Sequence, residues 1–382
     1  MTSAATPAPS VLSVGRALPK HYADQEQLVH ALKRLWVKQH FNPARVDDMH
    51  RAVKVSSRYL ALPLKDYEDL DSFQKSNDAW IEVALDIGEA AVREALERAQ
   101  LTPQDVDHIF FVTVTGVAVP SLDARLVNRL GMRSDVKRTP IFGLGCMAGA
   151  AGVARAADYL RAFPDEVALL LSTELCSLTL QRGDLSVANL IATGLFGDGA
   201  AAVILGGGAR TPDLNHAVVH AREDNHAVAR TRDGNRAVGP QIVASRSVFY
   251  PDTERVMGWD MVDTGFKIVL AGNVPELVYK HVGKDVDSFL ATYQLDRSHI
   301  KHVVAHTGGP KVLSALSETL ELPPGALQRS WDSLEQVGNL SSASVLFVLR
   351  DLMDDDVARA GDYGLLLAMG PGFCSELVLL KW

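Results

Sequence analysis

The thiol of Cys146 is the most reactive group that the sequence places at the start of a helix. Cys146 lies in a run of small residues, 143–152, between a strand-like stretch at 139–142 and a helical pattern that begins near Ala148. A thiol at a helix N-terminus is close to the positive end of the dipole and to unpaired N–H groups, which favour the thiolate. Cys146 is therefore a candidate nucleophile that accepts acyl groups. Taken alone, it also fits a small buried cysteine packed against alanines.

Two further polar side chains follow short apolar stretches in the second half of the chain. His306 ends a predicted strand, residues 303–306, and precedes a Gly-Gly-Pro turn. Asn339 opens a predicted helix after Gly338, where its amide can cap the helix or face a cleft. Each residue alone also fits a structural role, as a core histidine or an N-cap. A thiol, an imidazole and an amide in one cleft would form an acyl-transfer site.

An internal repeat predicts that these three side chains meet. Four segments match in order between the halves: 101–113 with 295–307, 145–146 with 338–339, 169–171 with 365–367, and 202–205 with 377–380. In each half the order is strand, helix, strand, strand. Equivalent strand ends and helix starts of two related halves converge at their pseudo-symmetry axis. Cys146, His306 and Asn339 occupy such positions.

The elements that position these residues have an α/β pattern. Continuous apolar runs at 109–114, 167–171, 303–306 and 364–367 predict strands in sheets that are covered on both faces. They alternate with predicted helices such as 78–98 and 148–161, which indicates layered α/β halves. The first half carries extra residues, 176–194, before its last strand. In a duplicated fold, that surplus is where a segment that shapes the substrate site would grow.

Length and internal similarity suggest a division of the 382 residues into four parts. We expect a disordered tail at 1–10, a first half at 11–208, a surface insert at 209–239 and a second half at 240–382. The insert repeats an Asn-His/Arg-Ala-Val pattern every ten residues, which is typical of an expanded loop. Its histidines, His216, His220 and His226, lack a cysteine or a fixed carboxylate partner, so we expect no metal site.

Composition restricts the class of protein further. The formal charge of -8 leaves no footprint for nucleic acid, and no apolar run reaches the length of a membrane span. Three cysteines and an N-terminus without a signal-peptide pattern favour a reducing compartment, and hence a cytoplasmic protein. An anionic ligand would need a local basic cluster. The candidate cluster is formed by Arg51, Lys54 and Arg58.

Five motifs together resemble the signature set of type III polyketide synthases, the chalcone-synthase-like branch of the thiolase superfamily. These motifs are residues 143–149, 195–202, 306–310, 338–343 and 369–373. The likeness extends from about residue 9 to residue 382, excepting the ten-residue repeats. The run 115–124 is most similar to bacterial enzymes that make alkylpyrones or alkylresorcinols. The resemblance implies a thiolase-like fold of duplicated αβαβα halves with pseudo-twofold symmetry, and a homodimer.

The resemblance also implies an activity and roles for individual residues. Cys146 would take a starter from acyl-CoA, and we interpret this starter as a fatty acyl group. His306 and Asn339 would support its extension with malonyl-CoA. The extended chain would then cyclise to a pyrone or resorcinol. No metal or redox cofactor is implied, and the basic cluster of Arg51, Lys54 and Arg58 would bind the phosphates of coenzyme A. Phe196 and Phe266 match the family's gatekeeping aromatics. Thr179 and Ser341 match positions that line the cavity. The turn Gly370-Pro371-Gly372 matches the family's cyclisation turn.

Three other functions fit parts of the same pattern. An initiating β-ketoacyl-ACP synthase also uses cysteine, histidine and asparagine, but it takes malonyl groups from a carrier protein. A cysteine hydrolase would release free acid from acyl-CoA without carbon dioxide. A binding protein without activity would leave Cys146 unreactive toward acyl-CoA. The Gly-Pro-Gly turn and Phe196 favour the polyketide synthase.

Overall fold

A nine-stranded mixed sheet forms the framework of the protein. The computed structural model describes residues 7–37, 42–210, 239–355 and 357–382. The strand order is β11-β12-β13-β8-β1-β7-β6-β4-β5. The strands are β1 (Ser10–Ala17), β4 (His108–Thr113), β5 (Lys137–Phe142), β6 (Val167–Leu175), β7 (Asp198–Gly206), β8 (Gln241–Phe249), β11 (Ile300–Ala305), β12 (Tyr363–Gly370) and β13 (Cys374–Lys381).

The sheet consists of two similar halves that join at β1 and β8. Outward from the junction, β7, β6 and β4 follow β1, and β13, β12 and β11 follow β8. In both halves the first two of these neighbours run antiparallel and the third pairs parallel. A single residue pair, Ser10 with Gln241, links β1 to β8. This topology is the duplicated arrangement that the repeat predicts.

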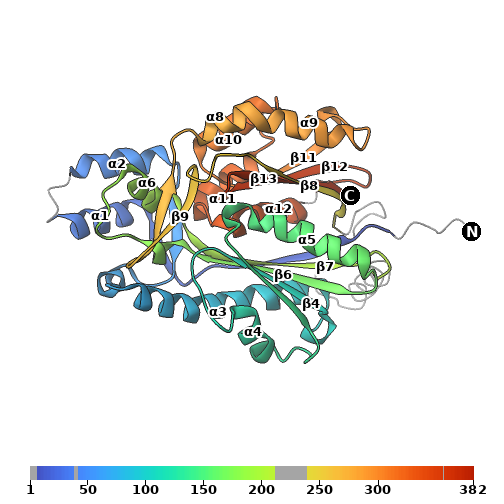
Figure 1. Cartoon of the computed structure of the whole chain (residues 1–382), viewed down its shortest axis with the longest axis horizontal. Helices are drawn as coiled ribbons and strands as arrows, with labels where there is room; N and C mark the ends of the chain where they lie inside the picture. Colours follow the sequence, from blue (N-terminus) through green and yellow to red (C-terminus); the bar gives the residue numbers. More distant parts are fainter. Residues whose placement is uncertain (1–6, 38–41, 211–238, 356) are drawn as a thin grey trace, which may run out of the picture.

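Helices form three layers around the two halves of the sheet (Figure 1). Helices α5 (Ala148–Ala162) and α12 (Ser344–Asp354) lie between the halves. One outer layer contains α3 (Phe73–Ala99) and α4 (Leu122–Leu130). The other contains α8 (Val274–Leu277), α9 (Gly283–Ala291) and α10 (Pro310–Thr319), with a π-helical stretch at Val278–Val282. Helix α11 (Gln328–Val337) lies beside α12.

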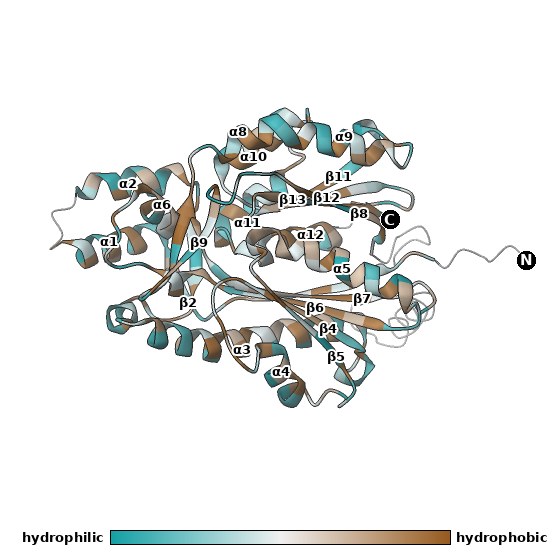
Figure 2. Cartoon of the chain, viewed as in Figure 1, coloured by the Kyte–Doolittle hydropathy of each residue, from teal (hydrophilic) through white to brown (hydrophobic). Residues whose placement is uncertain are grey.

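Each helical layer has its own hydrophobic core. The core around α5 and α12 contains inward-facing residues of both half-sheets, and separate cores lie under α3 and under α10. Strands β6 and β7 are buried along their whole length, as expected for strands covered on both faces. Figure 2 shows these strands as largely hydrophobic, whereas the outer helix α3 mixes hydrophobic and hydrophilic residues.

A smaller group of elements covers one end of the sheet. It contains α1 (Gln25–Trp36), α2 (Pro43–Ala52) and α6 (Val187–Leu195), the two-stranded sheet of β2 (His21–Asp24) and β3 (Ser57–Leu60), and the hairpin of β9 (Met257–Val262) and β10 (Gly265–Leu270). Asp24 caps α1 with a complete capping box, which fixes where this helix begins. The helix α6 lies within the extra segment of the first half.

Some sequence expectations differ from the observed boundaries. Ser10, the last residue of the expected disordered tail, opens β1 instead, and Ile242 N donates to Pro9 O at 2.7 Å. Hydrogen bonds to neighbouring strands stabilise these residues, which explains why they are ordered. Most of the expected insert, including His216, His220 and His226, lies outside the described residues. Among the described residues, no helix combines the length and apolar character that crossing a membrane requires.

Candidate active site

Cys146 lies in a short 3₁₀ turn, Gly145–Met147, that leads directly into α5. The chain enters this turn from β5 through Gly143 and Gly145, whose φ angles are 96° and 52°. A Cβ at Gly145 would approach Pro371 Cδ to 2.5 Å, so this position has room only for glycine. The Cys146 turn therefore packs closely under the Gly370-Pro371-Gly372 loop of the other half.

Asn339 lies two residues before the equivalent 3₁₀ turn of the second half, Ser341–Ala343, and Ser341 connects it to Cys146. The Cys146 Sγ lies 3.7 Å from Ser341 Oγ. Asn339 Oδ1 accepts from Ser341 N at 2.8 Å and from Ser344 Oγ at 3.4 Å. The carbonyl side of the Asn339 amide thus caps the turn before α12, which leaves its NH₂ group as the donor for the site.

Ser341 has an unusual backbone conformation between these two residues. Its φ of 50° lies in the left-handed region, which a non-glycine residue rarely adopts. The bond from its N–H to Asn339 Oδ1 holds it there, and its side chain reaches the Cys146 thiol. Such backbone strain concentrates at functional sites. Ser341, predicted to line the cavity, lies in contact with Cys146.

The segment Leu195–Phe196 joins the loops that carry Asn339 and His306. Asn339 N donates to Leu195 O at 2.8 Å, and Gly197 N donates to Asn339 O at 3.0 Å. A Cβ at Gly309, three residues after His306, would lie 3.6 Å from the Leu195 side chain. Leu195 is therefore the shared neighbour of the two loops, and Phe196 lies beside Asn339.

His306 follows the last residue of β11, at the carboxyl end of the strand, as the sequence predicts. Its backbone N–H donates to Leu367 O in β12 at 3.0 Å. The side chain is 4% exposed, and among the described residues its Nδ1 has no hydrogen-bond partner. A buried ring nitrogen without a partner is a group that a substrate or a transferred proton can satisfy.

Burial determines the resting charge of the thiol and the imidazole. Burial raises the pKa of Cys146 to about 12, and it lowers the pKa of His306 to about 4. Both directions favour the neutral groups, because desolvation disfavours each charged form. The helix N-terminus acts in the opposite direction at Cys146. A thiolate at this position therefore requires a positive partner.

The buried carboxyl group of Glu174 lies close to the Cys146 turn, although the sequence analysis did not identify it. Glu174 Oε2 accepts from Val114 N at 3.1 Å and Thr115 Oγ1 at 2.9 Å, and Oε1 accepts from Ser342 Oγ. Burial raises the pKa of Glu174 to about 7, and its charge adds to the rise at Cys146. The sequence did contain a signal for this residue, because a carboxylate in the mostly apolar stretch 167–175 is unusual.

The second predicted gatekeeper, Phe266, lies in an aromatic cluster beside β9. Its ring contacts Phe73 edge-on at 5.6 Å between centroids, and the rings of Phe142 and Trp259 lie at 6.3 and 6.2 Å. Phe142 is the last residue of β5, on the chain that leads to Cys146. Phe266 is therefore buried between the β9–β10 hairpin and the approach to the Cys146 turn.

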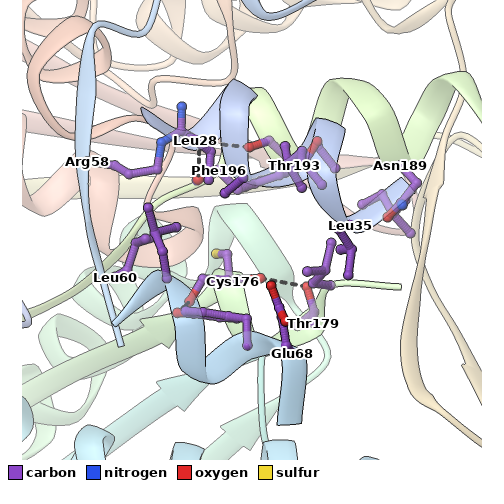
Figure 3. A pocket seen from close by; sticks show the side chains of 18 of the residues that line it. Leu28, Leu35, Arg58, Leu60, Glu68, Cys176, Thr179, Asn189, Thr193 and Phe196 are labelled. Atoms are coloured by element: carbon purple, nitrogen blue, oxygen red, sulfur yellow. Dashed lines mark hydrogen bonds between the residues drawn. The ribbon is translucent and has the colours of Figure 1, made fainter. Parts of the chain in front are cut away.

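An apolar pocket opens next to Phe196, between the helices of the small covering group (Figure 3). Its volume is about 850 Å³ including the open mouth. The lining contains Phe196, Thr179, Cys176 and mostly aliphatic side chains, among them Leu28, Leu32, Leu35, Leu60, Leu64, Leu180 and Ile268. Thr179 donates to Cys176 O, so its methyl group is available to the pocket. The extra segment of the first half thus builds one wall.

The predicted basic cluster for coenzyme A is not a cluster, and one of its members was wrongly assigned. Arg51 is exposed and paired with Asp48, and Lys54 is exposed. Arg58 is only 1% exposed and donates to backbone carbonyls of α6, so it cannot reach a phosphate in solvent. The sequence gives no direct signal for this burial, because alternation in a four-residue strand is too short to assign faces.

All three cysteines are free, and the described residues contain no group of three potential metal ligands. Cys176 and Cys374 are buried. Burial raises the pKa of both thiols, as it does at Cys146, so the pKa does not distinguish the three cysteines. Cys176 forms part of the pocket wall, and Cys374 opens β13.

The chain matches two family models along nearly its whole length. Residues 1–209 match the N-terminal domain of chalcone and stilbene synthases, and residues 241–382 match the C-terminal domain. The 1,3,6,8-tetrahydroxynaphthalene synthase of Streptomyces peucetius subsp. caesius is 47% identical, covering 98% of this chain and 93% of its own. Phloroglucinol synthase of Pseudomonas fluorescens is 30% identical, covering 95% and 96%.

Solved structures show the same relationship. The crystal structure of 1,3,6,8-tetrahydroxynaphthalene synthase from Streptomyces coelicolor A3(2), a bacterial type III polyketide synthase, superposes with a TM-score of 0.85 at 30% identity, covering 98% of this chain and 99% of that one. Polyketide synthases of this kind are acyltransferases that catalyse decarboxylative condensation, and they share the thiolase-like fold. The chain belongs to the chalcone and stilbene synthase family, the type III polyketide synthases of the thiolase superfamily.

Proposed function

We propose that this polyketide synthase loads an acyl group on Cys146 and extends it with malonyl-CoA, using His306 and Asn339. The observation that carries the proposal is the contact chain from Cys146 through Ser341 to Asn339, with Leu195 linking the His306 loop to the same turn. These contacts support a site between the two halves that combines the Cys146 thiol, the Asn339 amide and the His306 imidazole.

Loading is a transfer of the acyl group between two sulfur atoms. The Cys146 proton passes to His306 as Sγ attacks the thioester carbonyl of acyl-CoA. The carbon–sulfur bond to coenzyme A then breaks, and the imidazolium returns the proton to the departing thiolate. Burial opposes either charge alone, so the ion pair forms only as the two groups exchange the proton.

Extension uses the same residues for a carbon nucleophile. Malonyl-CoA loses carbon dioxide, and the electron pair of the broken bond forms an enolate on the thioester. The Asn339 NH₂ group and the His306 ring donate to the enolate oxygen, where negative charge develops. The enolate carbon attacks the Cys146 thioester, which releases the thiolate and leaves a chain longer by two carbons. In this proposal the half-buried Phe196, at the pocket, and the buried Phe266 shield the enolate from water.

The aliphatic lining of the pocket favours a starter with an alkyl tail. A hydrocarbon chain gains about 0.8 kcal/mol for each methylene removed from water. Phe196 belongs both to the pocket lining and to the Asn339 bridge, so a tail in the pocket places its thioester toward the Cys146 side. We therefore propose a fatty acyl starter, with a pyrone or resorcinol as the cyclised product. The Gly370-Pro371-Gly372 loop over Cys146 shapes the space for cyclisation.

A second candidate product is a polyhydroxynaphthalene made from malonyl units alone. The observation that favours it is the 47% identity to a protein named 1,3,6,8-tetrahydroxynaphthalene synthase. The two candidates differ in whether malonyl-CoA alone is sufficient for product formation.

We also propose a homodimer that covers the carboxyl ends of β4 and β5. Val119 is 98% exposed, and Val117 and Phe142 are also exposed near the same strand ends. A second copy would bury these apolar side chains. Arg51 and Lys54 remain proposed surface contacts for coenzyme A phosphates, supported by their exposure on and just after α2.

The decisive experiment feeds labelled malonyl-CoA with a ladder of acyl-CoA starters and identifies the products by mass spectrometry. We expect products that retain the acyl carbons, with a preference for longer tails. Ala192→Trp, which fills the pocket lining, should shift that preference toward short starters by roughly tenfold. An aromatic product from malonyl-CoA alone, unaffected by acyl-CoA, would instead support the naphthalene candidate. Size-exclusion chromatography with light scattering tests the dimer, and Val119→Asp should weaken it.

A further inference from the structure

The buried guanidinium of Arg58 binds the C-terminus of α6, directly before the gatekeeping Phe196. Its Nη1 donates to Thr193 O at 3.0 Å and to Phe196 O at 2.9 Å, and its Nη2 donates to Gly194 O at 2.6 Å. Gln25 Oε1 accepts a further bond from Nη2. Figure 3 shows Arg58 beside Phe196 and Thr193 at the edge of the pocket.

The sequence of α6 explains why an arginine is needed at this position. The helix ends without glycine at its C-cap and without a basic residue in its last turn. Its last carbonyl groups are therefore without intrahelical donors and carry the negative end of the helix dipole. A guanidinium, which offers several donors in one plane and a positive charge, satisfies both requirements at once. Burial lowers the pKa of Arg58 to about 10, so it remains charged at neutral pH.

Phe196 is consequently held from two opposite sides. On one side, Arg58 binds its carbonyl oxygen. On the other side, the neighbours of Phe196 bind Asn339, through Asn339 N to Leu195 O at 2.8 Å and Gly197 N to Asn339 O at 3.0 Å. The position of the Phe196 ring, which lines the pocket, depends on both attachments.

Two neighbours of Arg58 connect this clamp to the helices that cover the pocket. Gln25, the first residue of α1, donates through Nε2 to Gly194 O at 3.2 Å and to His50 O at 3.1 Å. His50 in α2 lies 3.2 Å through its Nε2 from Thr193 Oγ1. The guanidinium therefore binds α1 and the gate segment after α6 directly, and α2 is linked to it through Gln25 and Thr193.

We infer that Arg58 is a positioning residue for the Phe196 gate. Arg58 holds Phe196 between the pocket and Asn339, and this position keeps water away so that each enolate formed goes on to condensation. The inference rests on the proposed function. If the gate moves, water reaches the enolate, and malonyl-CoA is decarboxylated to acetyl-CoA without extending the chain. A displacement of about 1 Å at a reacting centre costs as much as 10²-fold in rate.

The test measures carbon dioxide released and polyketide formed in the same reaction, for Arg58→Lys, Phe196→Ala and the double variant. Lysine keeps the charge but cannot bind three carbonyl oxygens in one plane. We expect the ratio of polyketide to carbon dioxide to fall by roughly tenfold in each single variant. In the double variant it should fall little further, because Arg58 acts through Phe196.

The matched control is Arg350→Lys. Arg350 is also buried and also donates to a backbone carbonyl, Val14 O at 2.6 Å, but it lies at the far end of α12. This variant should lower the thermal midpoint of unfolding without changing the ratio. If Arg58→Lys proves unstable, Gln25→Ala, which removes one partner of the guanidinium, should lower the ratio in the same direction by a smaller factor.

Three outcomes would overturn the inference. The first is a ratio of polyketide to carbon dioxide that is the same in Arg58→Lys and Arg350→Lys at matched stability. The second is additive effects of Arg58→Lys and Phe196→Ala on this ratio. The third applies if Arg58→Lys does not fold, and is an unchanged ratio in Gln25→Ala. Intact-mass measurement of acyl-Cys146 in the wild-type protein separates these failures from failure of the proposed function. If the wild-type protein itself forms no acyl-Cys146 and releases no carbon dioxide, the proposed function is wrong.

Discussion

The two halves of the molecule contain the same short 3₁₀ turn before a helix, but different side chains lie at it. In the first half, the turn Gly145–Met147 precedes α5 and contains the thiol of Cys146. In the second half, the turn Ser341–Ala343 precedes α12, and the amide of Asn339 lies two residues before it. Both turns begin at a residue with positive φ, Gly145 at 52° and Ser341 at 50°. In the proposed mechanism, the first turn therefore supplies a nucleophile and the second a hydrogen-bond donor.

The contacts of the two turns are reciprocal. Gly145 packs against Pro371, in the loop between β12 and β13 of the second half. Gly338 packs against Leu195 O and Gly197 N, directly before β7 of the first half. Each half thus closes over the turn of the other with its own connection between two equivalent strands. This exchange explains why the site lies between the halves and needs both.

The two connections differ in length, and the difference creates the pocket. The second half joins β12 to β13 through residues 371–373 alone. The first half uses residues 176–197, which contain α6 and supply Thr179, Asn189, Ala192 and Phe196 to the pocket lining. The short loop only covers Cys146, whereas the long one also encloses substrate space. Specificity is therefore expected to depend on the first half.

Exchanging the nucleophile gives the largest expected effect. Cys146→Ala should abolish acyl loading and reduce product formation by at least about 10³-fold, because no other group near the turn can form the thioester. Intact-mass spectrometry after incubation with acyl-CoA checks the loading, and circular dichroism checks the fold. A Cys176→Ser protein serves as the labelling control, in which the adduct should still map to residue 146. A Cys146→Ala protein that keeps its product yield contradicts the assignment.

The equivalent exchange in the other turn separates loading from extension. Asn339→Asp keeps an oxygen that can accept from Ser341 N, but it replaces the NH₂ donor with a negative charge. We expect release of carbon dioxide from malonyl-CoA to fall about 10²–10³-fold, which is the usual cost of losing one donor to a developing oxyanion. Acylation of Cys146 should continue. Equal losses in both steps would show that Asn339 acts on the fold of the turn alone.

The elements that repeat in the two halves could be predicted from the sequence. The roles of residues that depend on packing between distant segments could not. Continuous apolar strands and the glycine turn before α5 are local patterns, so the order of elements agrees with expectation and Cys146 lies directly before a helix. Asn339 was expected to open a helix, but α12 begins at Ser344, after the 3₁₀ turn Ser341–Ala343. Arg58 was misassigned because its burial comes from α6, a segment far along the chain. Glu174 was missed because its partners, Thr115 and Ser342, come from separate loops. Long-range contacts decide such roles, and one sequence does not display them.

The reciprocal glycines provide a smaller test of the same symmetry. Alanine at Gly145 would place Cβ 2.5 Å from Pro371 Cδ, and alanine at Gly338 would place it 2.8 Å from Leu195 O. We expect each substitution to reduce the free energy of unfolding by roughly 2–3 kcal/mol, from unfavourable φ plus the contact. Gly361 is the control, since its φ is 93° but no atom lies within 4 Å of the added Cβ. Urea unfolding should show a smaller loss, about 1 kcal/mol, for Gly361→Ala.

The buried titratable groups beside the two turns predict opposite pH dependences of stability. Burial raises the pKa of Glu174 from 4.5 to about 7, so its contribution is fully present below pH 4.5 and is lost as pH rises through 7. Burial lowers the pKa of His306 from 6.5 to about 4, so its contribution is present above pH 6.5 and is lost as pH falls through 4. Between pH 5 and pH 6 the two nearly cancel in the wild-type protein.

Single substitutions should reveal each contribution in that window. Relative to the wild type, Glu174→Gln should gain about 1 kcal/mol of unfolding free energy as pH rises from 5 to 6, and His306→Gln should lose about as much. Both values follow from 1.36 kcal/mol per pH unit for one proton. Urea unfolding at the two pH values measures them, with Arg350→Lys as a variant whose difference from wild type should not change. If the unfolding free energies of both variants changed in the same direction between pH 5 and pH 6, Glu174 and His306 would not titrate independently. The opposite pH dependences expected for the two groups would then be wrong.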